Sequence, residues 1–322
     1  MLRLASVVAA FAGAVAVAGA QDYPSGPVTM VVPFAPGGTT DVLARIVAPA
    51  MAAHLGQNVL VENVGGAGGR IGTQQVIRAE PDGQVITFGN MGPLAAAMGV
   101  FDDMDYDPRT DLAPVGLVAD VPMVLAASKA SGVETLDAFI EKLRAEGEAV
   151  NFGTAGIGAT SDLAPALFLS LTGLSGTRIP YQGAGPAIVD LQAGMMDAVI
   201  DQTVTMIPIE LGDQGTALAV SGNERQPQIP DVPTFAEAGV PEFDMTVWNA
   251  VAAPVGTPEA VIERLAEAID AALADPGVQA RFEQLGVPVP PQDVRGPQAL
   301  GALIAGEVER WEATLANETA AR

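Results

Sequence analysis

The chain has 322 residues with no cysteine and one histidine, and its 38 acidic residues outnumber 15 basic ones, which gives a formal net charge of −23. Without cysteine it can hold neither a disulfide, nor a thiolate metal site, nor a cysteine nucleophile. The negative charge makes nucleic acid and anionic membrane surfaces poor partners, and a carboxylate ligand must gain its affinity locally, against the long-range field of the chain.

The first twenty residues predict an export signal. Arg3 is their only charge, an apolar stretch covers residues 4–17, and Ala18-Gly19-Ala20 forms a small-residue cleavage box. The apolar stretch is short for a membrane span, and no second hydrophobic segment of spanning length follows in the sequence. We predict that residues 1–20 are a signal peptide cleaved after Ala20, which leaves a chain long enough for two lobes.

Short β-rich runs then alternate with longer helical ones. Strands predicted over 28–32, 58–62 and 85–88 alternate with helices predicted over 41–55, 71–78 and 94–98. This βα alternation is typical of a parallel sheet with helices on its faces.

A second series of the same kind begins at residue 121. Its predicted strands are 121–127, 149–152, 177–181, 198–201 and 217–220, and its predicted helices are 136–145, 162–171 and 187–193. After a proline-rich link over 226–241, the apolar stripe of residues 258–274 predicts a helix packed on the core.

These two series predict two α/β lobes. We expect residues 22–120 and 223–322 to form the first lobe, and residues 121–222 to form the second. Ligands of open α/β sheets bind at the carboxyl ends of the strands, so the cleft between the lobes is the expected binding site.

A five-residue phrase occurs twice, each time between a predicted strand and a predicted helix. It reads Gly37-Gly38-Thr39-Thr40-Asp41 in the first lobe and Gly158-Ala159-Thr160-Ser161-Asp162 in the second. Glycines let the backbone approach a ligand closely, and the N–H groups and dipole of a helix start attract anions. Two such loops facing one cleft would grip an anionic or carbonyl-bearing small molecule, although each phrase alone also fits an ordinary helix start.

Two further loops carry candidate residues. Glycines crowd residues 65–72 but fit neither the dinucleotide motif nor the P-loop, so we predict a turn that opens the following helix. Residues 90–92 follow the strand 85–88 and form a third loop at a carboxyl end, where they are expected to line the cleft.

Motifs of the common catalytic and metal sites are absent from the sequence. There is no G-x-S-x-G elbow and no H-E-x-x-H, and His54 falls inside the predicted helix 41–55. We predict no catalytic residue, no metal and no cofactor. An alternative pairs Asp41 with Asp162 as the two carboxylates of a secreted hydrolase, but their first-turn positions favour interaction with the helix dipole.

Ordered motifs run through the chain after the signal. They are P-F-A-P-G-G-x-x-D at 33–41, V-E-N at 61–63, P-Y-x-G-x-x-P-A at 180–187, P-D-V-P-T at 230–234 and E-A-G at 237–239, with Trp248 before Ala253-Pro254. Together they resemble the Bug (TctC-like) family of periplasmic solute receptors of tripartite tricarboxylate transporters. The resemblance spans essentially the whole mature chain.

The resemblance implies a fold and a role. The fold is the α/β, two-lobed periplasmic-binding-protein (Venus flytrap, type II) fold, in which each lobe is a mostly parallel sheet flanked by helices and the ligand lies between the lobes. The role is that of a periplasmic, monomeric, non-enzymatic receptor that captures a small organic carboxylate and delivers it to an integral-membrane permease. Presentation of the ligand to a sensor kinase is an alternative that uses the same fold.

Carried over by motif, the resemblance also implies a set of ligand-binding residues on the two loops and around them. The set is Phe34, Gly38, Thr39, Thr40, Asp41, Asn90, Met91, Thr154, Gly158, Ala159, Thr160, Ser161, Tyr181 and Asp201.

Two positions depart from the family pattern. Many members carry a histidine where this chain has Asp162 and a lysine where it has Gln182. Both changes remove potential positive charge near the cleft, and a buried anion needs local compensation. We therefore expect a monoanion, a zwitterion or a small diacid rather than a tricarboxylate, with Asp162 as the position where ligand choice differs from that of relatives.

Overall fold

A computed structural model describes the backbone of residues 23–320 and the side chains up to residue 314. The predicted signal peptide lies outside the described residues. The strands in this part of the chain form one nine-stranded sheet in the order β2-β1-β3-β9-β4-β7-β5-β6, with β8 pairing on β4. Their bounds are β1 Val28–Val32, β2 Val59–Asn63, β3 Val85–Asn90, β4 Leu112–Ala127, β5 Asn151–Thr154, β6 Thr177–Pro180, β7 Ala198–Gln202, β8 Thr216–Val220 and β9 Thr246–Pro254.

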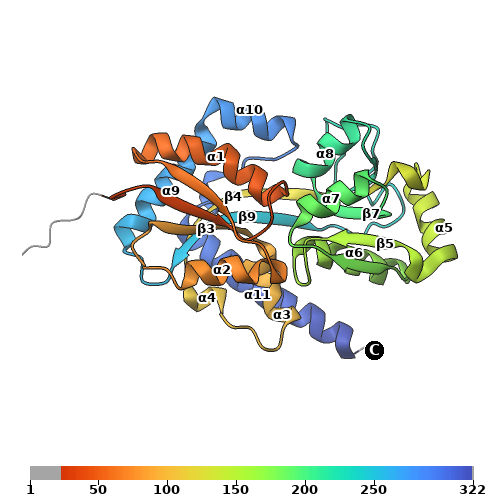
Figure 1. Ribbon diagram of the computed structural model, residues 1–322, viewed down its shortest axis with the longest axis horizontal. Coiled ribbons are helices and arrows are strands. Elements are labelled where there is room, and N and C mark those ends of the chain that lie inside the picture. The colour runs from red at the N-terminus through yellow and green to blue at the C-terminus, as the bar shows by residue number, and fades with distance from the viewer. Residues whose placement is uncertain (1–22, 321–322) are drawn as a thin grey trace, which may run out of the picture.

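Helices cover both faces of this sheet (Figure 1). Their bounds are α1 Thr39–Leu55, α2 Arg70–Ile77, α3 Ala97–Val100, α4 Pro108–Asp111, α5 Leu136–Glu146, α6 Thr160–Thr172, α7 Ala184–Gln192, α8 Thr203–Leu211, α9 Glu259–Ala274, α10 Pro276–Gln284 and α11 Pro297–Ala320. Short 3₁₀ turns cover Ala67–Gly69, Lys129–Ser131, Gly147–Ala149 and Gln292–Val294, and a π-helical turn covers Gly92–Ala96.

Two long strands, β4 and β9, connect the two halves of the molecule. Strands β1, β2 and β3 pair in parallel on one side, and β5, β6 and β7 pair in parallel on the other. Between them β9 runs antiparallel to β3 and β4, and β4 continues past β9 to pair antiparallel with β7 and β8. Figure 1 shows β4 and β9 crossing from the half with α1, α2 and α9 to the half with α5, α6 and α7.

Alternation along the strands produces two hydrophobic cores, one on each face. In β4, Val124 and Ala126 belong to the core under α1, α7, α8 and α9, whereas Met123, Leu125 and Ala127 belong to the core under α5, α6 and α11. Successive strand residues point to opposite faces, so this apolar end of β4 serves both cores. Each core therefore continues from one half of the molecule into the other.

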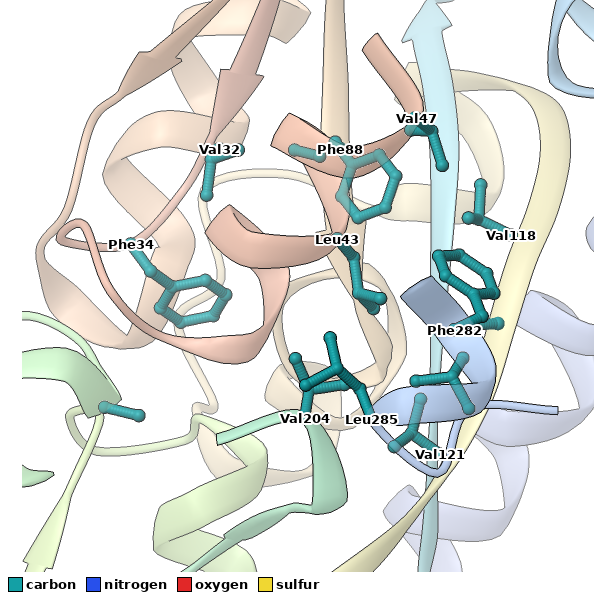
Figure 2. Packing of buried hydrophobic residues seen from close by; sticks show 14 of the residues in the cluster. Val32, Phe34, Leu43, Val47, Phe88, Val118, Val121, Val204, Phe282 and Leu285 are labelled. Atoms are coloured by element: carbon teal, nitrogen blue, oxygen red, sulfur yellow. The ribbon is translucent and has the colours of Figure 1, made fainter. Parts of the chain in front are cut away.

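The first of these cores shows the connection directly. Figure 2 shows Leu43 of α1, Val204 of α8 and Leu285, which follows α10, pointing into the same space. All three side chains are buried. The apolar packing therefore holds α8 of one half against α1 and α10 of the other, directly behind the loops that precede α1.

The predicted α/β fold class is confirmed, and so is each strand and helix predicted by range. Elements missed by the sequence patterns are β9, the first half of β4, and helices α4, α8, α10 and α11. The prediction of mostly parallel lobes also omitted the antiparallel pairs made by β4 and β9. These two strands are mostly apolar and buried, with Asp120, Thr246 and Asn249 as their polar residues, so they show neither the regular alternation nor the turn signals that identify a strand. The predicted lobe boundary at 120/121 falls inside β4.

Candidate functional site

The two copies of the five-residue phrase form the same local structure. Gly37 and Gly158 have φ of 87° and 82°, a left-handed conformation that glycine adopts without steric cost. The next residues, Gly38 and Ala159, are the extended N-caps of α1 and α6, with φ, ψ of −84°, 170° and −71°, 157°. The sequence repeat is therefore a repeat of backbone geometry at two strand-to-helix turns.

The aspartate of each phrase holds its own turn in place. Asp41 Oδ2 accepts the N–H of Gly37 at 3.0 Å, and Asp162 Oδ2 accepts the N–H of Gly158 at 3.2 Å. Both carboxylates are buried. Each therefore fixes the glycine turn four residues before it.

Each of these aspartates also has an arginine partner. Asp41 Oδ1 accepts hydrogen bonds from Arg45 Nε and Asn63 Nδ2, both at 2.9 Å, while Asp162 Oδ2 lies 2.8 Å from a guanidinium nitrogen of Arg178. Burial works against ionisation of Asp41, but the bonds from Arg45, Gly37 and Asn63 hold its pKa below the ordinary value. Burial raises the pKa of Asp162, and the Arg178 charge opposes this only in part.

The first turns of α1 and α6 are open toward a common cavity. Neither helix has a side-chain cap at its N-terminus, so the N–H groups of these turns are available for a bound anion. The space free of protein atoms in and directly outside the cavity is about 280 Å³, part of which is open solvent. Its lining residues are Phe34, Gly38, Thr39, Thr40, Asn90, Ala155, Ala159, Thr160, Ser161, Ala184, Asp201 and Gln202.

The structure brings nine of the fourteen predicted site residues to this cavity. They are Phe34, Gly38, Thr39, Thr40, Asn90, Ala159, Thr160, Ser161 and Asp201. The other five lie behind or beside it. Asp41 and Gly158 hold the turns as described above, Met91 is buried in the second hydrophobic core, Thr154 Oγ1 accepts the N–H of Gly156, and the hydroxyl of Tyr181 donates to Asp190 Oδ2 at 2.6 Å.

Three lining residues were not predicted. Ala155 begins the turn after β5, Ala184 is the first residue of α7, and Gln202 ends β7 next to Asp201. A signal for Gln202 and Ala184 was present, because both lie where a strand ends or a helix begins at the carboxyl edge of the sheet. The starts of α1, α6 and α7 therefore all meet at the cavity.

A chain of hydrogen bonds between amide and hydroxyl groups forms the floor of the cavity. Asn90 Nδ2 donates to Thr40 Oγ1 at 3.3 Å, Thr40 Oγ1 donates to Asn249 Oδ1 at 3.3 Å, and Asn249 Nδ2 donates to Gln202 Oε1 at 2.7 Å. Asn249 is fully buried on β9, and no sequence motif pointed to it. This chain links β3 and α1 of one half to β7 of the other.

We expect Asn249→Ala to lower the free energy of unfolding by about 2–3 kcal/mol, because Gln202 and Thr40 would each lose a partner in a buried site. Urea denaturation of the purified variant measures this. Asn223→Ala changes an exposed asparagine and serves as the control, with an expected change below about 0.5 kcal/mol. If Asn249→Ala lowers the free energy of unfolding no more than the control does, the hydrogen-bond chain at the cavity floor does not stabilise the fold.

Beside the cavity the two halves touch backbone to backbone. The N–H of Ala35 donates to the carbonyl of Gln182 at 2.9 Å. A Cβ added at Gly185 would lie 2.2 Å from the carbonyl oxygen of Pro36, and one added at Gly68 would lie 2.2 Å from that of Ile157. Only glycine permits these approaches. We call the contacts of Gly68 and Gly185 the glycine seam.

Charge in the cavity comes from one side chain and from the helix starts. Among the described residues that line the cavity, Asp201 alone is ionisable. Gln182 does not line the cavity, and Asp162 faces Arg178, so neither of the two family departures places or removes a charge on the cavity wall in this structure. Among the described residues no cluster of three potential metal ligands occurs. In the same part of the chain, no helix combines the length and apolar character needed to cross a membrane.

Two α/β halves are joined by crossing strands, and helix starts from both halves meet at one cavity. This arrangement is typical of periplasmic solute-binding proteins. Comparison with known proteins gives the family. Residues 43–319 match the sequence model of the "Tripartite tricarboxylate transporter family receptor" (TctC) family. The chain belongs to this family, whose members are periplasmic solute-binding receptors that bind small carboxylates and work with transporters.

Individual relatives agree with this assignment. BugT of Bordetella pertussis is 37% identical over 327 residues, which cover 100% of this chain and 99% of BugT. The structure of MatC from Rhodopseudomonas palustris with bound malate is 36% identical, with a TM-score of 0.88, and the similarity covers 91% of this chain and 100% of MatC. A second R. palustris protein, solved with adipate, is 33% identical, with a TM-score of 0.86 over 92% of this chain and 98% of that one.

Proposed function

We propose that this receptor binds a small organic carboxylate in the cavity between its halves and delivers it to the integral-membrane subunits of a tripartite transporter. The observation that carries the proposal is the pair of uncapped helix starts, α1 and α6, that line one cavity. Their N–H groups and dipoles favour a carboxylate without help from a cationic side chain. The malate in MatC and the adipate in its R. palustris relative support this ligand class.

The ligand residues of the proposal are the nine predicted residues that line the cavity, joined by Ala155, Ala184 and Gln202. Asp41 and Gly158 act on the ligand indirectly, by holding the two turns. Because no lysine, arginine or histidine occurs among the lining residues that the structure describes, a monoanion, a zwitterion or a small diacid fits the cavity better than a tricarboxylate. Tight binding of citrate, measured by calorimetric titration, would contradict this choice of ligand class.

The proposal includes movement of the two lobes, residues 22–120 with 223–322 against 121–222. Ligand binding shifts a two-state equilibrium toward the closed form, because the closed form alone places both helix starts on the ligand. The proposal takes the protein to act as a monomer and to catalyse no reaction. The hydrolase alternative loses its support, since the carboxylates of Asp41 and Asp162 are engaged in their own turns and neither is among the described lining residues.

A thermal-shift screen over C3 to C6 mono- and dicarboxylates tests the ligand class. An acid present at a hundred times its Kd should stabilise the protein by about 2.7 kcal/mol, because it binds the folded state alone. Small-angle scattering with the best acid should show compaction. The proposal fails if no carboxylate raises the melting temperature, or if a saturating acid leaves the scattering profile unchanged.

Delivery to the permease needs a separate measurement. Cells that lack the gene for this receptor should lose uptake of the labelled acid and regain it when the gene is restored on a plasmid. Uptake that persists at the normal rate in the deletion strain would contradict delivery while leaving ligand binding intact.

A further inference from the structure

One ionisable side chain in the cavity lacks an ionic partner. Asp201 lies near the end of β7, lines the cavity and is 3% exposed. Among the side chains described from residue 23 to residue 314, no lysine, arginine or histidine lies within ion-pair distance of its carboxylate. A buried charge of this kind normally pairs with a cation or is neutralised.

The direct partners of Asp201 are neutral groups. Thr205 Oγ1 donates to Asp201 Oδ2 at 2.8 Å, and Thr39 Oγ1 lies 3.5 Å from Thr205 Oγ1. Burial raises the pKa of Asp201 to about 6, and the hydrogen bonds from Thr205, the Gln202 backbone and Thr39 offset this only in part. The carboxylate therefore lies between two hydroxyl groups and the open space of the cavity.

Every other ionisable group on the elements packed around Asp201 is engaged elsewhere or exposed. Asp41 bonds to Arg45 within α1 and Asp162 pairs with Arg178. The remaining groups on these elements are His54, which contacts Arg264; Asp190, which accepts from Tyr181; Glu210, which accepts from Ala217; and the exposed Asp120 of β4. None of them compensates a charge on Asp201.

A ligand carboxylate next to this side chain meets one of two situations. If Asp201 is ionised, it repels the ligand unless the ligand brings a hydrogen-bond donor to it. If Asp201 is protonated, it can donate a hydrogen bond to a carboxylate oxygen of the ligand. An unsubstituted acid can use only the protonated form, whereas a hydroxy or amino acid can use the ionised form.

We infer that Asp201 is a specificity-determining residue that accepts a hydrogen bond from a hydroxyl or ammonium group of the ligand, so that the receptor selects substituted acids over their unsubstituted counterparts. This rests on the proposed function, because it deepens the choice of carboxylate at the same site. Thr205 is a positioning residue, since it orients the carboxylate through its own hydroxyl.

A matched series of diacids tests the inference by calorimetry. Succinate, malate and aspartate share a four-carbon skeleton and differ only in carrying hydrogen, hydroxyl or ammonium on the second carbon. Adipate, 2-hydroxyadipate and 2-aminoadipate form a second series. At pH 8 we expect the hydroxy and amino members of the binding series to have a Kd about tenfold or more below that of the unsubstituted member, because a hydrogen bond to a charged group is strong.

The affinities of the unsubstituted and amino members of a series should respond differently to pH. An unsubstituted diacid must bind together with a proton on Asp201, so its affinity should fall about tenfold or more between pH 6 and pH 8. The amino acid prefers the ionised carboxylate, so its affinity should stay constant or rise by about twofold over the same interval. This measurement uses the unmodified protein and needs no variant.

Asp201→Asn completes the test. The variant should bring the Kd values of the unsubstituted and amino members to within about threefold of each other. It should also remove the pH dependence of both Kd values above pH 6. Asp120→Asn, at an exposed position outside the cavity, is the control and should leave both patterns unchanged. If the Asp201 variant does not fold, the pH series of the native protein still decides the question.

Failure of the inference and failure of the proposed function are distinguishable. Equal affinity and equal pH dependence for the unsubstituted and amino members of a series would overturn the role of Asp201 while carboxylate binding stands. Absence of binding by every acid in both series and in the thermal-shift screen would overturn the proposed function itself.

Discussion

Gly185→Ala is expected to raise the Kd for the bound carboxylate about 10- to 100-fold without lowering the stability of the unliganded protein. In the structure the two halves touch beside the cavity, as the proposed closed form requires, and the new methyl group would lie 2.2 Å from the carbonyl oxygen of Pro36, a backbone atom of the other half. Overpacking of this kind costs about 1–3 kcal/mol, and that cost falls on the closed form alone. Gly185 is the second residue of α7 and has no positive φ, so alanine suits its helix in the open form.

A helical glycine elsewhere gives a matched control. A Cβ added at Gly306 of α11 would meet no atom within 4 Å, so Gly306→Ala should leave the Kd unchanged. Calorimetric titration gives the two Kd values, and scattering with saturating ligand reports whether the Gly185 variant still compacts. Wild-type affinity in Gly185→Ala would show that the glycine seam does not limit closure.

The most local features of this chain were predictable from its sequence. The repeated phrase predicted two equivalent strand-to-helix turns, because a left-handed glycine and a first-turn aspartate are encoded within five residues. Topology predicted that the two phrases face one cleft, since parallel strands present their carboxyl ends at one edge. The family resemblance supplied the list of site residues, nine of which line the cavity. The turn at residues 65–72 was predicted for the same reason, as glycines and helix starts are short-range signals.

Long-range partners were not predictable. Nothing near Asp162 in the sequence marks Arg178 as its partner, and nothing near Gln202 marks Asn249. The expectation that Asp162 sets the choice of ligand depended on its side chain facing the cavity. The structure instead turns that carboxylate to Gly158 and Arg178, and Asp201 is the ionisable group among the described residues that line the cavity.

The glycine seam is a second long-range feature that the sequence does not reveal. Gly68 falls in the glycine-rich segment 65–72, which has a local explanation as a turn, and Gly185 lies just before the predicted helix 187–193 with no motif that marks it. Their contacts with Ile157 and Pro36 join segments more than 85 residues apart. A glycine required by a distant backbone atom looks the same in a sequence as one required by its own turn, and only the three-dimensional arrangement separates them.

Asp41→Ala is expected to cost about 3 kcal/mol of the free energy of unfolding at pH 7. The change removes the acceptor of the Gly37 N–H, the Asn63 amide and the Arg45 guanidinium in one step. Bonds to a buried charged group contribute about 1.5–3 kcal/mol each and are costly to leave unmade, but the Arg45 side chain is 52% exposed, so solvent weakens that contact. Arg45→Met removes the exposed cation alone and should cost about 0.5–1 kcal/mol.

The cost of Asp41→Ala should also depend on pH. The folded protein holds the pKa of Asp41 below its ordinary value of 3.8, so the unfolded chain takes up the proton first as the pH falls. The stabilisation is therefore complete above about pH 5 and is lost as the pH drops through the folded pKa. Urea titrations at pH 7, 5, 4 and 3 should show the two proteins converging only at the lowest values, because all other carboxylates are common to both. A constant difference down to pH 3 would mean that the ionised carboxylate is not what holds the first turn.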